Sequence, residues 1–149
     1  MQKQHYTIDI NAPREKVWEI VTNPQTYAQW VRVFGEGSHF QGDWSVGSKM
    51  LFLAPNSEGK MDGMIATIAE NTPPEFISIK HIGYLMNGVE DTESDRIKAW
   101  APAFENYTFE SIDSGTRFTV DIDVEDEYKE MFEEMWPKAL AKIKELSEA

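Results

Sequence analysis

Apolar and polar residues alternate along several stretches of the chain, and this alternation predicts strands. Near the N-terminus, Tyr6, Ile8 and Ile10 take one face while Thr7 and Asp9 take the other, which is the period of a half-buried strand. Turns rich in glycine, proline, asparagine and serine follow, and such short connections favour antiparallel pairing. Six further strands are predicted, at residues 38–44, 49–54, 60–70, 76–84, 100–112 and 116–124.

The last part of the chain has the period of a helix. On a helical wheel its apolar residues gather on one half and its charged residues on the other, which predicts a long amphipathic helix over residues 125–148. Pro137 falls opposite the apolar stripe, so its ring is predicted on the outside, bending the helix around what it covers. The apolar stripe consists of Tyr128, Met131, Phe132, Met135, Trp136, Ala139, Leu140, Ile143 and Leu146.

Two short helices are predicted after the first strand. The Asn-Ala-Pro of residues 11–13 opens one of them and the Asn-Pro of residues 23–24 opens the other, because these residues favour helix starts. Residues 83–99 fit neither a strand nor a helix and are predicted to form a long solvated loop. No repeat or linker divides the chain, so residues 1–149 are predicted to form one α+β domain.

The charge balance excludes several classes of partner. The 149 residues include 14 Lys and Arg against 26 Asp and Glu, a net charge of −12, so no nucleic-acid partner is predicted. No apolar run is long enough to span a membrane, so no membrane insertion is predicted. The first residues have no apolar signal core, which favours a cytoplasmic protein. With no cysteine, disulfides, thiolate metal ligands and a cysteine nucleophile are excluded.

The order of the predicted elements and several short motifs resemble a known superfamily. The motifs are Asn-Ala-Pro-x-x-x-Val-Trp at residues 11–18, Pro73-Pro74 before a strand, the Gly115-Thr116 turn and Trp136 in the last helix. Over nearly its whole length the chain resembles the START-like, or SRPBCC, superfamily, also called helix-grip. Within it the chain is most similar to the group named after the C-terminal domain of an activator of a heat-shock chaperone ATPase. The resemblance implies a curved antiparallel sheet of six to seven strands wrapped around a long C-terminal helix.

The resemblance also implies a cavity between the sheet and the long helix. Five Trp, eight Phe, five Tyr and seven Met suit a pocket for a hydrophobic, aromatic or lipid-like molecule, although the same side chains could fill one another's space as core. In strand 60–70, Met64 and Ile68 compete with Ile65 for the inward face. The candidate lining residues are Trp30, Phe40, Met50, Phe52, Ile65, Ile79, His81, Trp100, Glu105, Tyr107, Phe118, Val120, Phe132, Met135 and Trp136.

Two polar residues are candidates for direct contact with a ligand. His81 shares a predicted strand face with Ile79, and Glu105 shares one with Tyr107. A buried carboxylate can bind a polar group or act as an acid or base; alternatively, Glu105 pairs with a nearby cation such as Arg96. No catalytic residue is assigned.

Other chemistry finds little support. The serines lie in no Gly-x-Ser-x-Gly turn, the histidines lack metal-binding spacing, and the acidic residues 90–95 lack the calcium-loop pattern. Neither a metal nor a cofactor is predicted, and no glycine-rich phosphate loop is present. Ligand binding is therefore the first functional hypothesis. A polyketide cyclase, aromatase or dehydratase type of enzyme working in the same cavity is the second. A chaperone-interacting module rests on the family name alone and is not expected, while a homodimer stays open.

Overall fold

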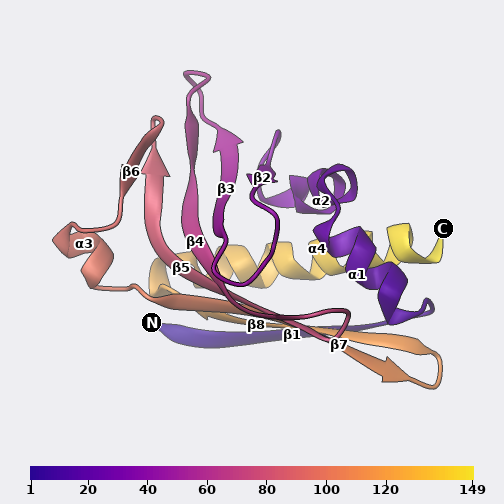
Figure 1. Cartoon of the computed structure of the whole chain (residues 1–149). Helices are drawn as coiled ribbons and strands as arrows, with labels where there is room; N and C mark the ends of the chain where they lie inside the picture. The colour runs from indigo at the N-terminus through magenta and orange to yellow at the C-terminus, as the bar shows by residue number, and fades with distance from the viewer.

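An antiparallel sheet of eight strands curves around one long helix (Figure 1). The computed structural model describes every residue from Met1 to Ala149. Across the sheet the strand order is β1-β8-β7-β5-β4-β3-β2, and β6 pairs with β5. The strands are β1 (Gln2–Ile10), β2 (His39–Gln41), β3 (Lys49–Pro55), β4 (Met61–Thr72), β5 (Phe76–Met86), β6 (Val89–Asp91), β7 (Ala103–Ile112) and β8 (Gly115–Val124). The predicted α+β class and helix-grip arrangement are confirmed.

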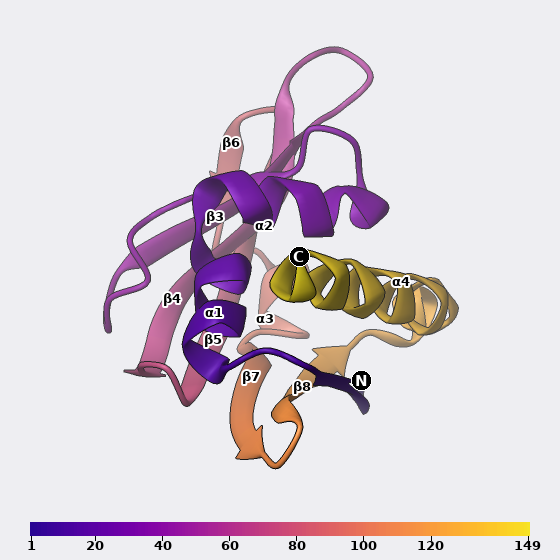
Figure 2. The ribbon, with the colours of Figure 1, turned by 90° about the vertical axis from the view of Figure 1, so that its right-hand side faces the viewer.

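Three of the helices, α1, α2 and α4, gather on the concave side of this sheet, whereas α3 lies apart from them beside β5 and β6 (Figure 1). Figure 2 shows α4 seen along its axis, with α1 and α2 beside it and β8 below it; α4 contacts β1, α1, α2 and η1. None of the helices is long and apolar enough to cross a membrane. The helices are α1 (Arg14–Thr22), α2 (Pro24–Trp30), α3 (Asp95–Lys98) and α4 (Lys129–Glu148), with 3-10 turns η1 (Val31–Phe34) and η2 (Asp126–Tyr128).

Local sequence explains where the short helices begin. The side chain of Asn23 accepts a hydrogen bond from the backbone N–H of Gln25 at 2.9 Å, and Pro24 occupies the first position of α2, as the Asn-Pro pair predicts. α1 begins after Pro13 and has no side-chain cap, so burial of Val17 and its apolar neighbours holds it in place instead.

The amphipathic pattern of the last helix is realised in α4, although this helix begins at Lys129 after a 3-10 turn and Met131 of the predicted stripe is exposed. Trp136, Ala139 and Ile143 are buried in the main core, while Pro137 lies within α4 on its exposed side. Each large apolar side chain removed from water in this way contributes about 1.5–3 kcal/mol before the entropy of ordering is counted. The C-terminal half of α4 is therefore the part that closes the core.

The segment predicted as a solvated loop is instead structured, so that prediction is wrong. β5 extends to Met86, and Asn87 and Gly88 both adopt positive φ angles, of 52° and 78°, before β6 pairs back. An Asn-Gly pair is the preferred sequence of such a two-residue hairpin turn. Ser94 then caps α3 by accepting from the backbone N–H of Ile97.

Candidate functional site

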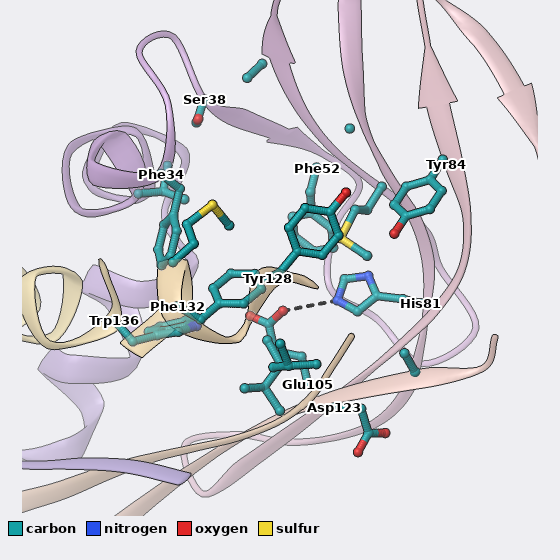
Figure 3. A pocket seen from close by; sticks show the side chains of 18 of the residues that line it. Phe34, Ser38, Phe52, His81, Tyr84, Glu105, Asp123, Tyr128, Phe132 and Trp136 are labelled. Carbon is teal, nitrogen blue, oxygen red and sulfur yellow. Dashed lines mark hydrogen bonds and ion pairs between the residues drawn. The ribbon is translucent and has the colours of Figure 1, made fainter. Parts of the chain in front are cut away.

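A cavity of about 360 Å³ lies between the concave face of the sheet and the start of α4 (Figure 3). Of its 27 lining residues, 19 are hydrophobic. Aromatic rings come from α2, η1, three strands, the segment before β7, η2 and α4. They include Tyr27, Phe34 and Tyr128, which sequence reasoning did not select. The volume falls within the range of small-molecule pockets, which are commonly apolar with few polar groups.

About half of the candidate residues chosen from the sequence do line this cavity. They come from α2, β3, β5, the segment before β7, β7 itself and α4, so the fold brings together positions far apart in the chain. The residues are Trp30, Phe52, His81, Trp100, Glu105, Tyr107, Phe132 and Trp136.

Other candidates belong to the core rather than to the cavity. The main core cluster contains Ile79, Met50, Phe118 and Val120. For these residues the alternative interpretation, that they fill one another's space as core, is correct. For Phe118 and Val120 on β8, the reason is that α1 packs on β7 and β8 while α4 packs on the neighbouring β1. Phe118, for example, packs on Phe109 with ring centroids 4.9 Å apart.

Phe40 and Met135 also lie outside the cavity lining. Phe40 packs edge-on against Tyr27, with ring centroids 4.9 Å apart, and supports the cavity wall from behind. Met135 is only partly buried, because it lies at the edge of the stripe that Trp136 and Ile143 occupy on α4.

The prediction that Ile65 faces inward is wrong, and the alternative choice of Met64 and Ile68 is correct. Met64 lies opposite Phe52 across the β3–β4 pair and lines the cavity, while Ile68 joins the core. Ile65 therefore points to the opposite face of the sheet, where it is also buried. Because this strand is apolar on both faces, alternation alone cannot choose between them.

An irregularity in β5 gives the cavity one of its polar residues. Ala66 pairs with His81 whereas the preceding Ile65 pairs with Gly83, so β5 has one extra residue there, a β-bulge. As a result His81 and Tyr84, three positions apart, both line the cavity. Regular alternation would have turned Tyr84 away. The signal in the sequence is Gly83, since an isolated glycine in a strand often marks a bulge.

His81, Glu105 and Tyr107 form one hydrogen-bonded group on the cavity wall. His81 Nε2 lies 3.1 Å from Glu105 Oε1, and the Tyr107 hydroxyl donates to Glu105 Oε2. Because a carboxylate only accepts hydrogen bonds, Nε2 is the protonated nitrogen of this pair. The side chains of His81 and Glu105 are 5% and 14% exposed. Glu105 thus binds its neighbouring strand and not Arg96.

Two tyrosines beside Glu105 are held in their neutral form. Burial, reinforced by the charge of Glu105, raises the pKa of Tyr107 well above its usual value. Burial is also the main cause that raises the pKa of Tyr27, and Glu105 again adds to it. Both phenols therefore remain hydrogen-bond donors at physiological pH.

Three buried polar atoms of the cavity residues have no hydrogen-bond partner. They are His81 Nδ1, Trp100 Nε1 and Trp136 Nε1. Figure 3 shows the indole nitrogen of Trp136 on the side of the ring that faces the cavity. Buried polar groups are almost always paired in native proteins, so these three unpaired atoms are exceptions among the residues that line the cavity.

The opening of the cavity is polar. The Tyr84 hydroxyl donates to Glu125 Oε1 at 2.8 Å, and burial followed by this bond raises the pKa of Tyr84. Asp123 pairs with Lys3 Nζ at 2.6 Å. No three His, Asp or Glu side chains gather closely enough to hold a metal ion. The arrangement can therefore bind an apolar molecule and hydrogen-bond its polar end.

Comparison with solved structures finds the same fold in several other proteins. Protein CV1439 from Chromobacterium violaceum superposes with a TM-score of 0.71 at 21% identity, covering 100% of this chain and 99% of that one. The AHSA1-like protein from Aeromonas hydrophila gives 0.71 at 17% identity, covering 97% and 91%. DynU16, a putative protein in the dynemicin biosynthetic locus, gives 0.70 at 16% identity, covering 97% of this chain and 46% of that one. These identities establish the fold alone.

A search of curated protein sequences finds no match. A family model described as "Activator of Hsp90 ATPase homolog 1-like protein", however, matches residues 11–148. That match spans all four α-helices and seven of the eight strands. The chain therefore belongs to the family of Activator of Hsp90 ATPase homolog 1-like proteins, as the motifs of its sequence suggested.

Proposed function

We propose that the protein binds a small hydrophobic or aromatic, lipid-like molecule in the cavity between the sheet and α4. The cavity itself carries the proposal: about 360 Å³ of space enclosed mainly by apolar side chains. Protein cores are normally packed to the density of organic crystals, and a void of this size is far larger than packing defects leave. A molecule that fills it would restore the missing contacts.

The expected affinity is moderate. A two-ring ligand that buries about 200 Å² of apolar surface gains about 5 kcal/mol from burial alone. Loss of translational and rotational freedom offsets part of that gain. A hydrogen bond to the carboxylate of Glu105, which lines the cavity and is 14% exposed, would then add to the affinity and fix the orientation of the ligand.

Ligand discovery followed by localisation tests this proposal. Native mass spectrometry of the purified protein and a thermal-shift screen of lipids and aromatic metabolites identify a ligand. NMR signals of the five tryptophan indole N–H groups then locate it. Trp30, Trp100 and Trp136 line the cavity, whereas Trp18 and Trp44 lie outside it and serve as internal controls. Signals that move only for the first three support the proposal. A screen without any stabilising compound, or shifts confined to Trp18 and Trp44, would rule it out.

A second candidate function is an enzyme of the polyketide cyclase, aromatase or dehydratase type. Two observations favour it: His81, Glu105 and Tyr107 all line one cavity, and a protein of similar fold belongs to the dynemicin biosynthetic locus. In such a reaction, the carboxylate of Glu105 or the free Nδ1 of His81 would take a proton from carbon beside a carbonyl group.

Hydrogen–deuterium exchange tests this second function separately. An enolisable bicyclic ketone such as 2-tetralone is incubated in deuterated buffer with the protein, and exchange beside the carbonyl is followed by NMR. Acceleration that is lost in Glu105→Gln would support proton abstraction. Exchange at the buffer rate, with the ketone bound, would reject the enzyme and leave the binding function in place.

We further propose that the partner is this small molecule and not a chaperone or nucleic acid. The net charge of −12 opposes contact with nucleic-acid phosphates. The chaperone activation in the family name describes the protein that gave the family its name. A pull-down with the chaperone is expected to recover nothing, and light scattering over a range of concentrations measures whether the chain forms a homodimer.

A further inference from the structure

The charged groups around the cavity are almost all of one sign. Four carboxylate residues line it, whereas no lysine or arginine does. Two histidines, His39 and His81, also line it. The carboxylate of Glu105 lies on the cavity wall, whereas that of Asp123 turns away from it and pairs with Lys3 (Figure 3). With low-dielectric walls around it, the charge of Glu105 gives the potential inside the cavity a negative sign. The four carboxylate residues are Asp62, Glu105, Asp123 and Glu125.

The positive groups nearby are the amino group of Met1, which is one of the lining residues, and two side chains that do not line the cavity. Lys3, the partner of Asp123, has a side chain that is 82% exposed. The amino group of Met1 lies 3.9 Å from Asp126. Arg96 lies over the Tyr84 ring, 5.2 Å from its centre. These cations reduce the negative potential at the opening, but none of them reaches the pair of Glu105 and His81.

Aromatic rings surround the space above Glu105. The faces of Trp, Tyr and Phe rings attract cations, and this attraction grows where water is excluded. Trp30 and Trp136 lie with ring centroids 6.1 Å apart, and both line the cavity. A desolvated carboxylate below such rings favours a hydrogen-bond donor or a cation and opposes a second anion.

Resting on the proposed binding function, we propose that the cavity selects hydrophobic amines, or neutral molecules with a hydrogen-bond donor, and rejects fatty acids and other anions. The apolar part of the ligand packs against the aromatic walls, and its donor group points to the carboxylate of Glu105.

Three matched probes test this selection. 2-Naphthylmethylamine, 2-naphthalenemethanol and 2-naphthoic acid share one ring system and differ in their polar group, so their apolar contributions are nearly equal. Affinity is measured by calorimetry, and the indole N–H signals of Trp30, Trp100 and Trp136 verify that each probe occupies the cavity. The amine is expected to bind about tenfold more tightly than the alcohol, and the acid is expected to bind most weakly.

Two isosteric variants assign the selection to one carboxylate. Glu105→Gln keeps the side-chain shape and removes the charge, and is expected to cost the amine about tenfold in affinity while changing the alcohol far less. Glu110→Gln is the matched control, because Glu110 lies on the same strand, is exposed and does not line the cavity. It is expected to preserve the order and the ratio of the three affinities.

The outcomes separate this inference from the binding function on which it rests. An acid that binds as tightly as the amine within the cavity would overturn the charge selection and leave ligand binding intact. Equal amine affinity in folded Glu105→Gln would overturn the role of that residue. Probes that leave the Trp30, Trp100 and Trp136 signals unmoved would overturn both proposals. The comparison among probes on the unaltered protein needs no variant to fold.

Discussion

The hydroxyl of Tyr84 on β5 donates to Glu125 Oε1 at 2.8 Å, which fastens the middle of the sheet to the segment that leads into α4. The bulge between His81 and Tyr84 is what turns this phenol toward the helix. One extra residue in a strand therefore does two things. It completes the rim of the cavity, and it ties the helix that covers the cavity to the sheet.

The folded protein is expected to lose stability in alkali because of its buried tyrosines. Burial is the main cause that raises the pKa of Tyr6, Tyr27, Tyr84 and Tyr107 above 10.0. Above pH 10, the tyrosines of the unfolded chain release protons that the same tyrosines retain in the folded chain. Since the folded state then binds more protons, its stability falls as pH rises through 10.

Ultraviolet absorbance of the phenolate measures this effect directly. At pH 10 the native protein is expected to show well under the absorbance of the same chain in denaturant, and the urea midpoint should decline from pH 9 upward. Equal phenolate absorbance in native and denatured samples would contradict the burial of these hydroxyl groups.

Removing the hydroxyl of Tyr107 is expected to lower the free energy of unfolding. Tyr107→Phe removes a donor from the carboxylate of Glu105, which leaves a buried charge less well paired. The expected loss is about 1–3 kcal/mol in the free energy of unfolding, measured by urea denaturation. Tyr128→Phe is the control, because its hydroxyl points away from Glu105 (Figure 3), and it should change stability little. Equal losses in the two variants would show that Glu105 does not depend on Tyr107.

Truncation of Trp136 is expected to have the largest effect of any single variant on the free energy of unfolding. Its ring packs on Phe34, with centroids 5.1 Å apart, and also contacts Tyr6 and Tyr107. Trp136→Ala is therefore expected to cost about 3–5 kcal/mol. Met131→Ala, on the same helix but 38% exposed, is expected to cost well under that. Similar midpoints of chemical denaturation for both variants would mean that the ring does not hold α4 against the sheet.

The sequence was sufficient where one side of an element is apolar and the other polar. The alternation of Tyr6 with Thr7 identified β1, and the wheel around Trp136 and Ile143 identified the buried face of α4. The polar residues His81 and Glu105 were also found, because each shares a strand face with apolar neighbours. In all these cases polar side chains face water and apolar side chains face the core, so the sequence pattern alone predicts which side each residue faces.

The remaining features depend on tertiary contacts that a linear pattern does not contain. Ile65 and Met64 are both apolar, and only pairing with Phe52 decides which of them faces inward. Phe118 and Phe52 have the same chemistry, yet helices cover one and leave space before the other. The bulge beside Gly83 reversed the side that Tyr84 faces, so a residue of the rim was missed although its glycine was visible.

The folded protein is expected to lose stability in acid because of a carboxylate at the C-terminal end of α4. The carboxylate of Glu148 accepts hydrogen bonds from Lys144 Nζ and from the backbone N–H of Asn11, the latter at 2.8 Å. The bond to Lys144 is the larger cause that lowers the pKa of Glu148 below its ordinary value of 4.5. A lowered pKa contributes stability that is fully present above the unfolded value and is lost as pH falls through the folded value.

Glu148→Gln should therefore destabilise the protein at pH 7, and the difference should shrink as pH falls through the lowered pKa of Glu148, where the carboxyl of the unaltered chain is itself protonated. Urea midpoints of both proteins across this range measure the difference. Glu145→Gln, on the same helix, removes an equal charge from an exposed pair with Lys142 and controls for the change in net charge. A difference between Glu148→Gln and the unaltered protein that stays constant from pH 7 to pH 3 would show that the link between α4 and the end of β1 does not depend on ionisation.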